Sequence, residues 1–306
     1  ESIVFYSERD GEPRIYRMRE DGSMAQPVGA PGDAALSPAF GPDGRLAFTV
    51  RRDDRWTIVS AGPDGSDLRV ESDAARDYWA PAYDPTSGRL IAHGPGPVDE
   101  ASRFESDEPG AFFLHPPQLV ELPDRSLSLQ AIRGYLPTLN VTAGEVATSE
   151  AFSRLVVTSL DGTQQRVVFD RADTDRYRGD VSVWGPSWSS DGQWLAFGVG
   201  LPFGAATEDV DIWKSRSDGS EAVNVTADSD ANDAFPDFSP DGRRIVFRST
   251  RDGNAEIYVM DADGTNVHRL TRHDATDTMP AFSSMGDRVA FSSLRDGDYE
   301  IYLLDV

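Results

Sequence analysis

Short apolar runs of four to six residues, rich in Val, Ile and aromatic residues, alternate along this chain with turns built on Asp-Gly. In residues 239–271, for example, Pro-Asp-Gly, Arg-Asp-Gly and Ala-Asp-Gly separate successive apolar runs. Runs of this length, bounded by such turns, predict β-strands joined by tight hairpins. Little of the chain is left for helices.

The pattern repeats along the chain, and each copy predicts four strands, which we name A to D. Apolar triplets of the Ile-Val-Phe kind mark strand B, and their starts are separated by 43, 44, 105, 50 and 44 residues. They begin at Ile3, Leu46, Leu90, Leu195, Ile245 and Val289. Five of them follow a Pro-x-aromatic element in strand A: Pro38-Ala39-Phe40, Pro81-Ala82-Tyr83, Pro186-Ser187-Trp188, Pro236-Asp237-Phe238 and Pro280-Ala281-Phe282.

Four antiparallel strands in a repeat of this length are typical of a β-propeller, whose blades bury their faces against one another. We therefore predict an all-β fold: a single six-bladed β-propeller domain over residues 1–306, with four-stranded antiparallel blades. The first copy starts at strand B (residues 3–6) and the last ends after strand C (residues 299–304), so the first and last blades are expected to be incomplete.

The spacing of 105 residues in the third copy predicts a long insertion over residues 94–153, between strands B and C of the third blade. Connections of this length are usually functional or disordered, and apolar clusters argue against disorder. Two interpretations remain open, a partner-docking arm and an extra hairpin packed on the blade edge. The apolar residues expected to bind a partner are Phe112, Phe113, Leu114, Leu119 and Leu122.

Composition narrows the range of partners. With 52 acidic and 29 basic residues the formal net charge is −23, which disfavours nucleic acid and anionic membrane surfaces. The chain has no cysteine, which excludes disulfides and thiolate chemistry, and it has no apolar run long enough to span a membrane.

The sequence carries no recognisable catalytic motif. There is no Gly-x-Ser-x-Gly elbow, no His-Glu-x-x-His and no phosphate-binding glycine loop. We therefore expect no catalytic residues, no metal site built on a known motif and no cofactor.

Aspartates recur a few residues ahead of strand A in five copies. A propeller would bring them together at one mouth of its channel, where they would attract a cation such as calcium or a basic peptide. The alternative is that each aspartate satisfies backbone N–H groups in its own turn. These candidate ligand-binding residues are Asp33, Asp77, Asp180, Asp233 and Asp277.

One family has a similar repeat. The Ser239-Pro240-Asp241-Gly242 hairpin, the Pro-x-aromatic element before it and the ending from Asp261 to Thr271 resemble the repeat of TolB-type six-bladed propellers. The resemblance implies a periplasmic or secreted module that binds a protein or peptide of the cell envelope. Since no catalytic motif is present, we expect a non-catalytic module that binds its partner through the loop face and the insertion over residues 94–153. Two alternatives stay open: an accessory propeller of, or itself, a peptidase- or amidohydrolase-type hydrolase, and a peripheral subunit of a larger membrane-associated assembly.

Overall fold

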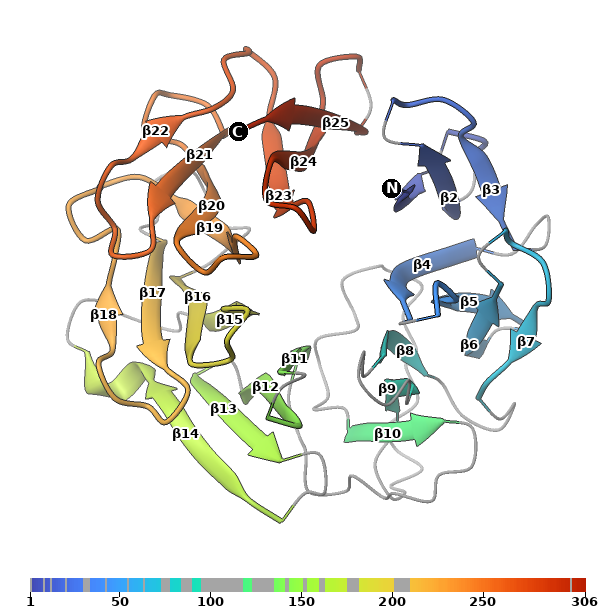
Figure 1. The fold of residues 1–306 in the computed structure, drawn as a ribbon, viewed down its shortest axis with the longest axis horizontal. Helices are drawn as coiled ribbons and strands as arrows, with labels where there is room; N and C mark the ends of the chain where they lie inside the picture. Colours follow the sequence, from blue (N-terminus) through green and yellow to red (C-terminus); the bar gives the residue numbers. More distant parts are fainter. Residues whose placement is uncertain are drawn as a thin grey trace. The chain divides into compact units, whose positions relative to one another are not determined.

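The computed structural model describes the chain as short antiparallel strands joined by turns (Figure 1). A short 3-10 turn, η2 (Arg171–Asp173), follows β14. No helix in the described part of the chain is long and apolar enough to cross a membrane. The described residues are 2–7, 9–11, 13–19, 21–29, 34–41, 43–53, 55–62, 64–72, 78–83, 90–94, 118–122, 135–140, 143–150, 153–159, 163–174, 182–200, 210–297 and 299–306.

The strands of the described residues form seven sheets, which fall into two compact units. Unit 1 comprises Glu1–Gly134 with Leu160–Thr163, and unit 2 comprises Tyr135–Ser159 with Gln164–Val306. In each sheet the strands follow one another in sequence order, as in the blades of a propeller.

Unit 1 contains three sheets. The first consists of β1 (Ser2–Ser7), β2 (Arg14–Arg19) and β3 (Gln26–Val28). The second consists of β4 (Ala34–Phe40), β5 (Leu46–Arg52), β6 (Arg55–Ala61) and β7 (Arg69–Val70). The third consists of β8 (Trp79–Tyr83), β9 (Leu90–Gly94) and β10 (Gln118–Leu122).

Unit 2 contains four sheets. The first consists of β11 (Tyr135–Asn140), β12 (Glu145–Glu150), β13 (Arg154–Ser159) and β14 (Gln165–Asp170). The second consists of β15 (Ser182–Trp188), β16 (Trp194–Gly200), β17 (Asp211–Arg216) and β18 (Val223–Asn224). The third consists of β19 (Asp233–Phe238), β20 (Arg244–Ser249), β21 (Glu256–Asp261) and β22 (His268–Arg269), and the fourth of β23 (Asp277–Phe282), β24 (Arg288–Ser293) and β25 (Glu300–Asp305).

The apolar triplets are continuous because both faces of their strands are buried. In β20, Ile245 and Phe247 pack with Ile212 of the preceding sheet. The residue between them, Val246, packs on the other face with Phe291 of the following sheet. Successive side chains of a strand point to opposite faces, so a strand held between two neighbouring sheets needs an unbroken apolar run.

Six of the described strands carry a proline followed two residues later by an aromatic residue or, in β11, by leucine, and we call them the first strands. They share a β-bulge. In β4, β8, β11, β15, β19 and β23 the register to the next strand shifts just before or at the proline. Four of the residues preceding the proline have φ angles in the left-handed region: Ser37 (52°), Gly185 (58°), Phe235 (55°) and Met279 (50°). The bulge turns the side chains on either side of the proline out of the regular pleat.

The all-β propeller fold is confirmed, and among the described residues the first and last sheets have three strands each. The division of the chain into copies differs. The described residues form seven sheets rather than six, because a further copy lies inside the 105-residue spacing. Its strand A carries Pro137-Thr138-Leu139, with leucine in place of the aromatic residue, and its strand B carries Val146-Ala147-Thr148.

The expected insertion over residues 94–153 is therefore not a single connection within one blade. Its β10 pairs with β9 in the third sheet, while β11 and β12 are strands A and B of the fourth. Strand β13, which follows the expected insertion, pairs with β12 and therefore belongs to the fourth sheet, not to the third blade. Leucine at the aromatic position and threonine at the end of the apolar triplet explain why the sequence pattern missed this blade.

Candidate functional site

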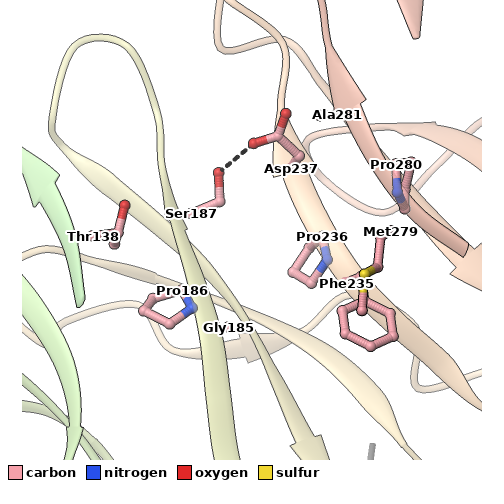
Figure 2. A pocket seen from close by; sticks show the side chains of 10 residues that line it. All are labelled: Thr138, Gly185, Pro186, Ser187, Phe235, Pro236, Asp237, Met279, Pro280 and Ala281. Atoms are coloured by element: carbon pink, nitrogen blue, oxygen red, sulfur yellow. Dashed lines mark hydrogen bonds between the residues drawn. The ribbon is translucent and has the colours of Figure 1, made fainter. Parts of the chain in front are cut away.

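Unit 2 has an open hollow of ≈ 290 Å³ among its first strands (Figure 2). Strand β15 packs against β11 and β19, and β19 packs against β23, so the four first strands lie in a row. Each contributes residues at or next to its bulge. We call this site the inner hollow; its chemically distinctive lining residues are Thr138, Gly185, Ser187, Phe235, Asp237 and Met279.

One end of the inner hollow is apolar. Phe235 and Met279 both line the hollow and are labelled in Figure 2. The Phe235 ring packs edge-on against Trp184 with centroids 5.0 Å apart, and the Arg248 guanidinium lies over the Phe235 ring, 5.1 Å from its centroid. Met279 is held less closely, since 48% of its surface is exposed. This end can contact an apolar group of a ligand.

The backbone at this end is strained. A left-handed conformation costs a residue with a Cβ about 1–2 kcal/mol, whereas glycine adopts it freely. Gly185 occupies the equivalent position in β15, so the fold itself accepts glycine there. Phe235 and Met279 keep bulky side chains at this position against the backbone preference. Strain of this kind is often found at functional sites.

The other end is polar and centres on Asp237. Its Oδ1 accepts a hydrogen bond from Ser187 Oγ at 3.0 Å, drawn in Figure 2, and its Oδ2 accepts one from the Phe282 backbone N–H at 2.9 Å. The carboxylate thereby ties β19 to β15 and β23. Burial raises the pKa of the Asp237 carboxyl, although both hydrogen bonds act in the opposite direction.

No cationic side chain within the described residues forms an ion pair with Asp237. The other acidic residues of β19 and β23 differ in this respect. The Asp233 side chain is fully buried, and Arg251 Nη2 donates hydrogen bonds to its two carboxylate oxygens at 3.2 and 3.1 Å. Asp277 receives Arg295 Nη2 at 3.1 and 2.9 Å in the same way.

Two of the five aspartates predicted to bind a ligand are thus placed by the structure. Asp233 and Asp277 begin β19 and β23, and their carboxylates face arginines from the hairpin that follows the next strand. This pairing gives each of them a structural role that requires no ligand. The remaining three lie outside the described residues: Asp33, Asp77 and Asp180.

The residues predicted to bind a partner through the insertion are only partly described. Leu119 and Leu122 lie in β10, opposite His93 and Leu90 of β9. Phe112, Phe113 and Leu114 lie outside the described residues, and their role stays a prediction. Among the residues that the structure describes, no group of three or more His, Cys, Asp or Glu side chains could hold a metal ion.

Sequence reasoning aligned the Pro-x-aromatic elements but did not select their middle residue. The hollow is lined by that residue in each of its four strands: Thr138, Ser187, Asp237 and Ala281. The signal was available, because the residue varies in chemistry while the proline before it does not. Within a repeat, the position that keeps the same residue in every copy is the one the fold requires, and the position whose residue changes is the one exposed at the surface.

Comparisons with known proteins identify the family. An uncharacterized protein of Agrobacterium fabrum is 37% identical over 94 residues, which are 28% of this chain and 30% of that protein. A TolB homologue of Chlorobium luteolum is 37% identical over 76 residues, which are 25% of this chain and 16% of that protein. The matches therefore span less than a third of the length of these curated relatives.

A solved structure, oligogalacturonate lyase from Vibrio parahaemolyticus, superposes with a TM-score of 0.69 over 100% of this chain and 86% of that chain. Their sequences are 16% identical, so this likeness concerns the fold alone. The family model described as TolB beta propeller domain (PD40) matches residues 129–306, which is more than half of the chain and includes the whole inner hollow. The chain therefore belongs to the TolB β-propeller domain family.

Proposed function

We propose that this chain is a non-catalytic propeller domain that binds a segment of a protein or peptide through the inner hollow, on the extracytoplasmic side of a bacterial envelope. Membership of the TolB propeller family supports the class of partner and the location. The fold likeness to a lyase does not favour an enzymatic role, since the two sequences share too little identity.

The observation that carries the proposal is Met279. It has a left-handed φ of 50° and an exposed fraction of 48%, so it bears backbone strain without filling the core. Gly185 at the equivalent position of β15 shows that the fold requires neither the strained backbone of a residue with a Cβ nor an exposed apolar side chain there. An apolar side chain held this way beside a hollow is suited to contact a partner.

The size of the hollow fits a segment rather than a large cofactor. At ≈ 290 Å³ it lies at the lower limit of typical small-molecule pockets, and it is open on one side. An extended peptide crossing the first strands could place one side chain in it while its backbone remains outside.

Panning the immobilised chain against a random linear peptide library tests the binding function. Enriched peptides should bind the wild type and lose at least tenfold in affinity for Met279→Ala. Met285→Ala is the matched control, because Met285 is 75% exposed and does not line the hollow. The proposal fails if no peptide is enriched, or if the two variants lose affinity equally.

Fractionation of cells that express the full-length protein tests the location separately. Recovery of the protein with periplasmic or secreted markers is expected, and recovery with cytoplasmic markers alone would contradict this part of the proposal.

A further inference from the structure

The Asp237 carboxylate carries more charge than its structural contacts require. Its Oδ2 accepts the backbone N–H of Phe282, which follows the middle residue of the next blade's motif. In the preceding blade the equivalent residue, Ser187, makes the same tie, since its Oγ accepts the backbone N–H of Phe238 at 3.2 Å. A neutral hydroxyl therefore suffices to join adjacent first strands, and the tie does not explain a carboxylate.

The charge is also uncompensated. Each of three buried carboxylates in the same two blades faces an arginine: Asp233 with Arg251, Asp277 with Arg295 and Glu256 with Arg269. Asp237 has no such partner among the described residues, and burial raises its pKa. Partly removing a carboxylate from water without a counter-charge is unfavourable, and a cation entering the hollow would offset that cost.

The two ends of the hollow suit a cation on an apolar stem. Phe235 and Asp237 lie on either side of Pro236 at the bulge of β19, so their Cα atoms are at most about 7 Å apart. Lysine and arginine side chains combine an aliphatic stem with a charged head over a comparable length, and they bury the stem against apolar surface. The formal net charge of −23 further favours a basic ligand over an acidic one.

We infer that the inner hollow is a subsite for one basic side chain of an extended peptide, with the stem against Phe235 and Met279 and the cationic head at Asp237. This inference rests on the proposed peptide-binding function and adds the chemistry of the anchor residue. Thr138 and Ser187 add hydroxyl groups to the lining of the hollow.

Blocked pentapeptides Ac-Gly-Gly-X-Gly-Gly-NH2, in which X is lysine, arginine, norleucine or glutamate, test the inference. Binding is followed by NMR shifts of the Ser187 and Phe282 amides in the labelled chain. The lysine or arginine peptide should bind the wild type at least tenfold more tightly than the norleucine peptide, and the glutamate peptide should bind least. Raising the salt concentration should reduce the difference.

The decisive variant is Asp237→Ser, which copies the residue that makes the same tie in the preceding blade. It should fold normally and lose the preference for lysine or arginine over norleucine. Asp228→Ser removes an exposed carboxylate and serves as the matched control for net charge. Ser187→Ala removes a hydrogen bond to Asp237 but leaves the charge, so the preference should persist.

The inference is overturned if no pentapeptide binds, if basic and norleucine peptides bind the wild type equally, or if Asp237→Ser retains the preference. Peptides enriched by panning that still require Met279 but contain no basic residue would overturn it while leaving the binding function intact. Failure of panning itself would instead refute the binding function on which the inference depends.

Discussion

The ion pair between Asp233 and Arg251 allows a quantitative test of how the blades of unit 2 are stabilised. Arg251 Nη2 lies 3.2 and 3.1 Å from the two carboxylate oxygens of Asp233, whose side chain is fully buried. The guanidinium also lies over the rings of Phe247 and Tyr258. Arg251→Met keeps an apolar side chain over those rings but leaves the buried carboxylate without its counter-charge.

The cost of this change has an upper limit set by protonation. The folded variant can always neutralise Asp233 by binding a proton, which costs about 1.4 kcal/mol for each pH unit above the ordinary aspartate pKa of about 3.9. At pH 7 the contribution of the charge therefore cannot exceed about 4 kcal/mol, in line with the 3–5 kcal/mol typical of a broken buried pair. The expected loss at pH 7 is this limit of about 4 kcal/mol less the cost that burial of Asp233 already imposes on the wild type.

The loss should depend on pH in a defined direction. Burial raises the pKa of Asp233 in the folded protein, so the folded state binds a proton at higher pH than the unfolded chain does. Acidification through this window, from the raised pKa down to about 3.9, favours the folded state. Removing Arg251 raises the pKa further, so the cost of the variant should shrink to about 1.5 kcal/mol at pH 5.

Urea unfolding at pH 7 and pH 5, followed by circular dichroism and tryptophan fluorescence to check for two-state behaviour, measures these losses. The double variant Asp233→Asn/Arg251→Met should recover much of the stability, because no buried charge remains. Arg216→Met is the control, since its partner Glu221 is 59% exposed and the pair is worth at most about 1 kcal/mol. A loss below 1 kcal/mol at pH 7, or one that is equal at both pH values, would refute the reasoning.

Three further predictions concern other repeated contacts. Met279→Gly should be about 1 kcal/mol more stable than Met279→Ala in urea unfolding, because only glycine relieves the φ of 50°; equal stabilities would contradict the strain. Thr271 Oγ1 donates a hydrogen bond to Glu256 Oε2 at 2.5 Å and accepts one from the Ile257 N–H at 2.9 Å. Thr271→Val should therefore lower the free energy of unfolding by about 3 kcal/mol, and Thr271→Ser by much less, as thermal unfolding of both variants would measure. The hydrogen bond to Asp296 raises the pKa of Tyr302 to about 12, so the folded state loses stability as pH rises from about 10 to 12. Asp296→Asn should move the midpoint of the phenolate absorbance titration toward about pH 10. An unchanged midpoint would exclude Asp296 as the cause.

The propeller fold could be predicted because its signals are local. Asp-Gly turns fix the hairpins, and the triplet Ile245-Val246-Phe247 requires a sheet neighbour on each face. The hidden blade could not be found by the same signature. Leu139 takes the aromatic position and Thr148 ends the triplet, yet backbone hydrogen bonds pair β11 with β12 regardless of those side chains.

The candidate site depended on contacts between distant residues, which a repeat alone does not reveal. Asp233 and Asp277 recur at one position, and this recurrence suggested a shared ligand. In the structure each of these aspartates pairs with an arginine of its own blade, Asp233 with Arg251 and Asp277 with Arg295. The arginine therefore recurs together with the aspartate. A repeated charge that has an equally repeated counter-charge at a fixed separation is better interpreted as an internal pair.

The positions that do not recur are therefore the more informative ones for function. Three of the first strands that line the hollow, β15, β19 and β23, place the same two backbone positions there, the residue before the proline and the residue after it, and β11 contributes the residue after it, Thr138. The bulge and the proline hold these positions in place, so their side chains can change without altering the strand pairing. In β15 they are Gly185 and Ser187, which satisfy the backbone at little cost, whereas in β19 they are Phe235 and Asp237, which add strain and an uncompensated charge. Because the fold imposes neither the strain nor the charge, these two residues are the basis of our proposal that the inner hollow binds a ligand.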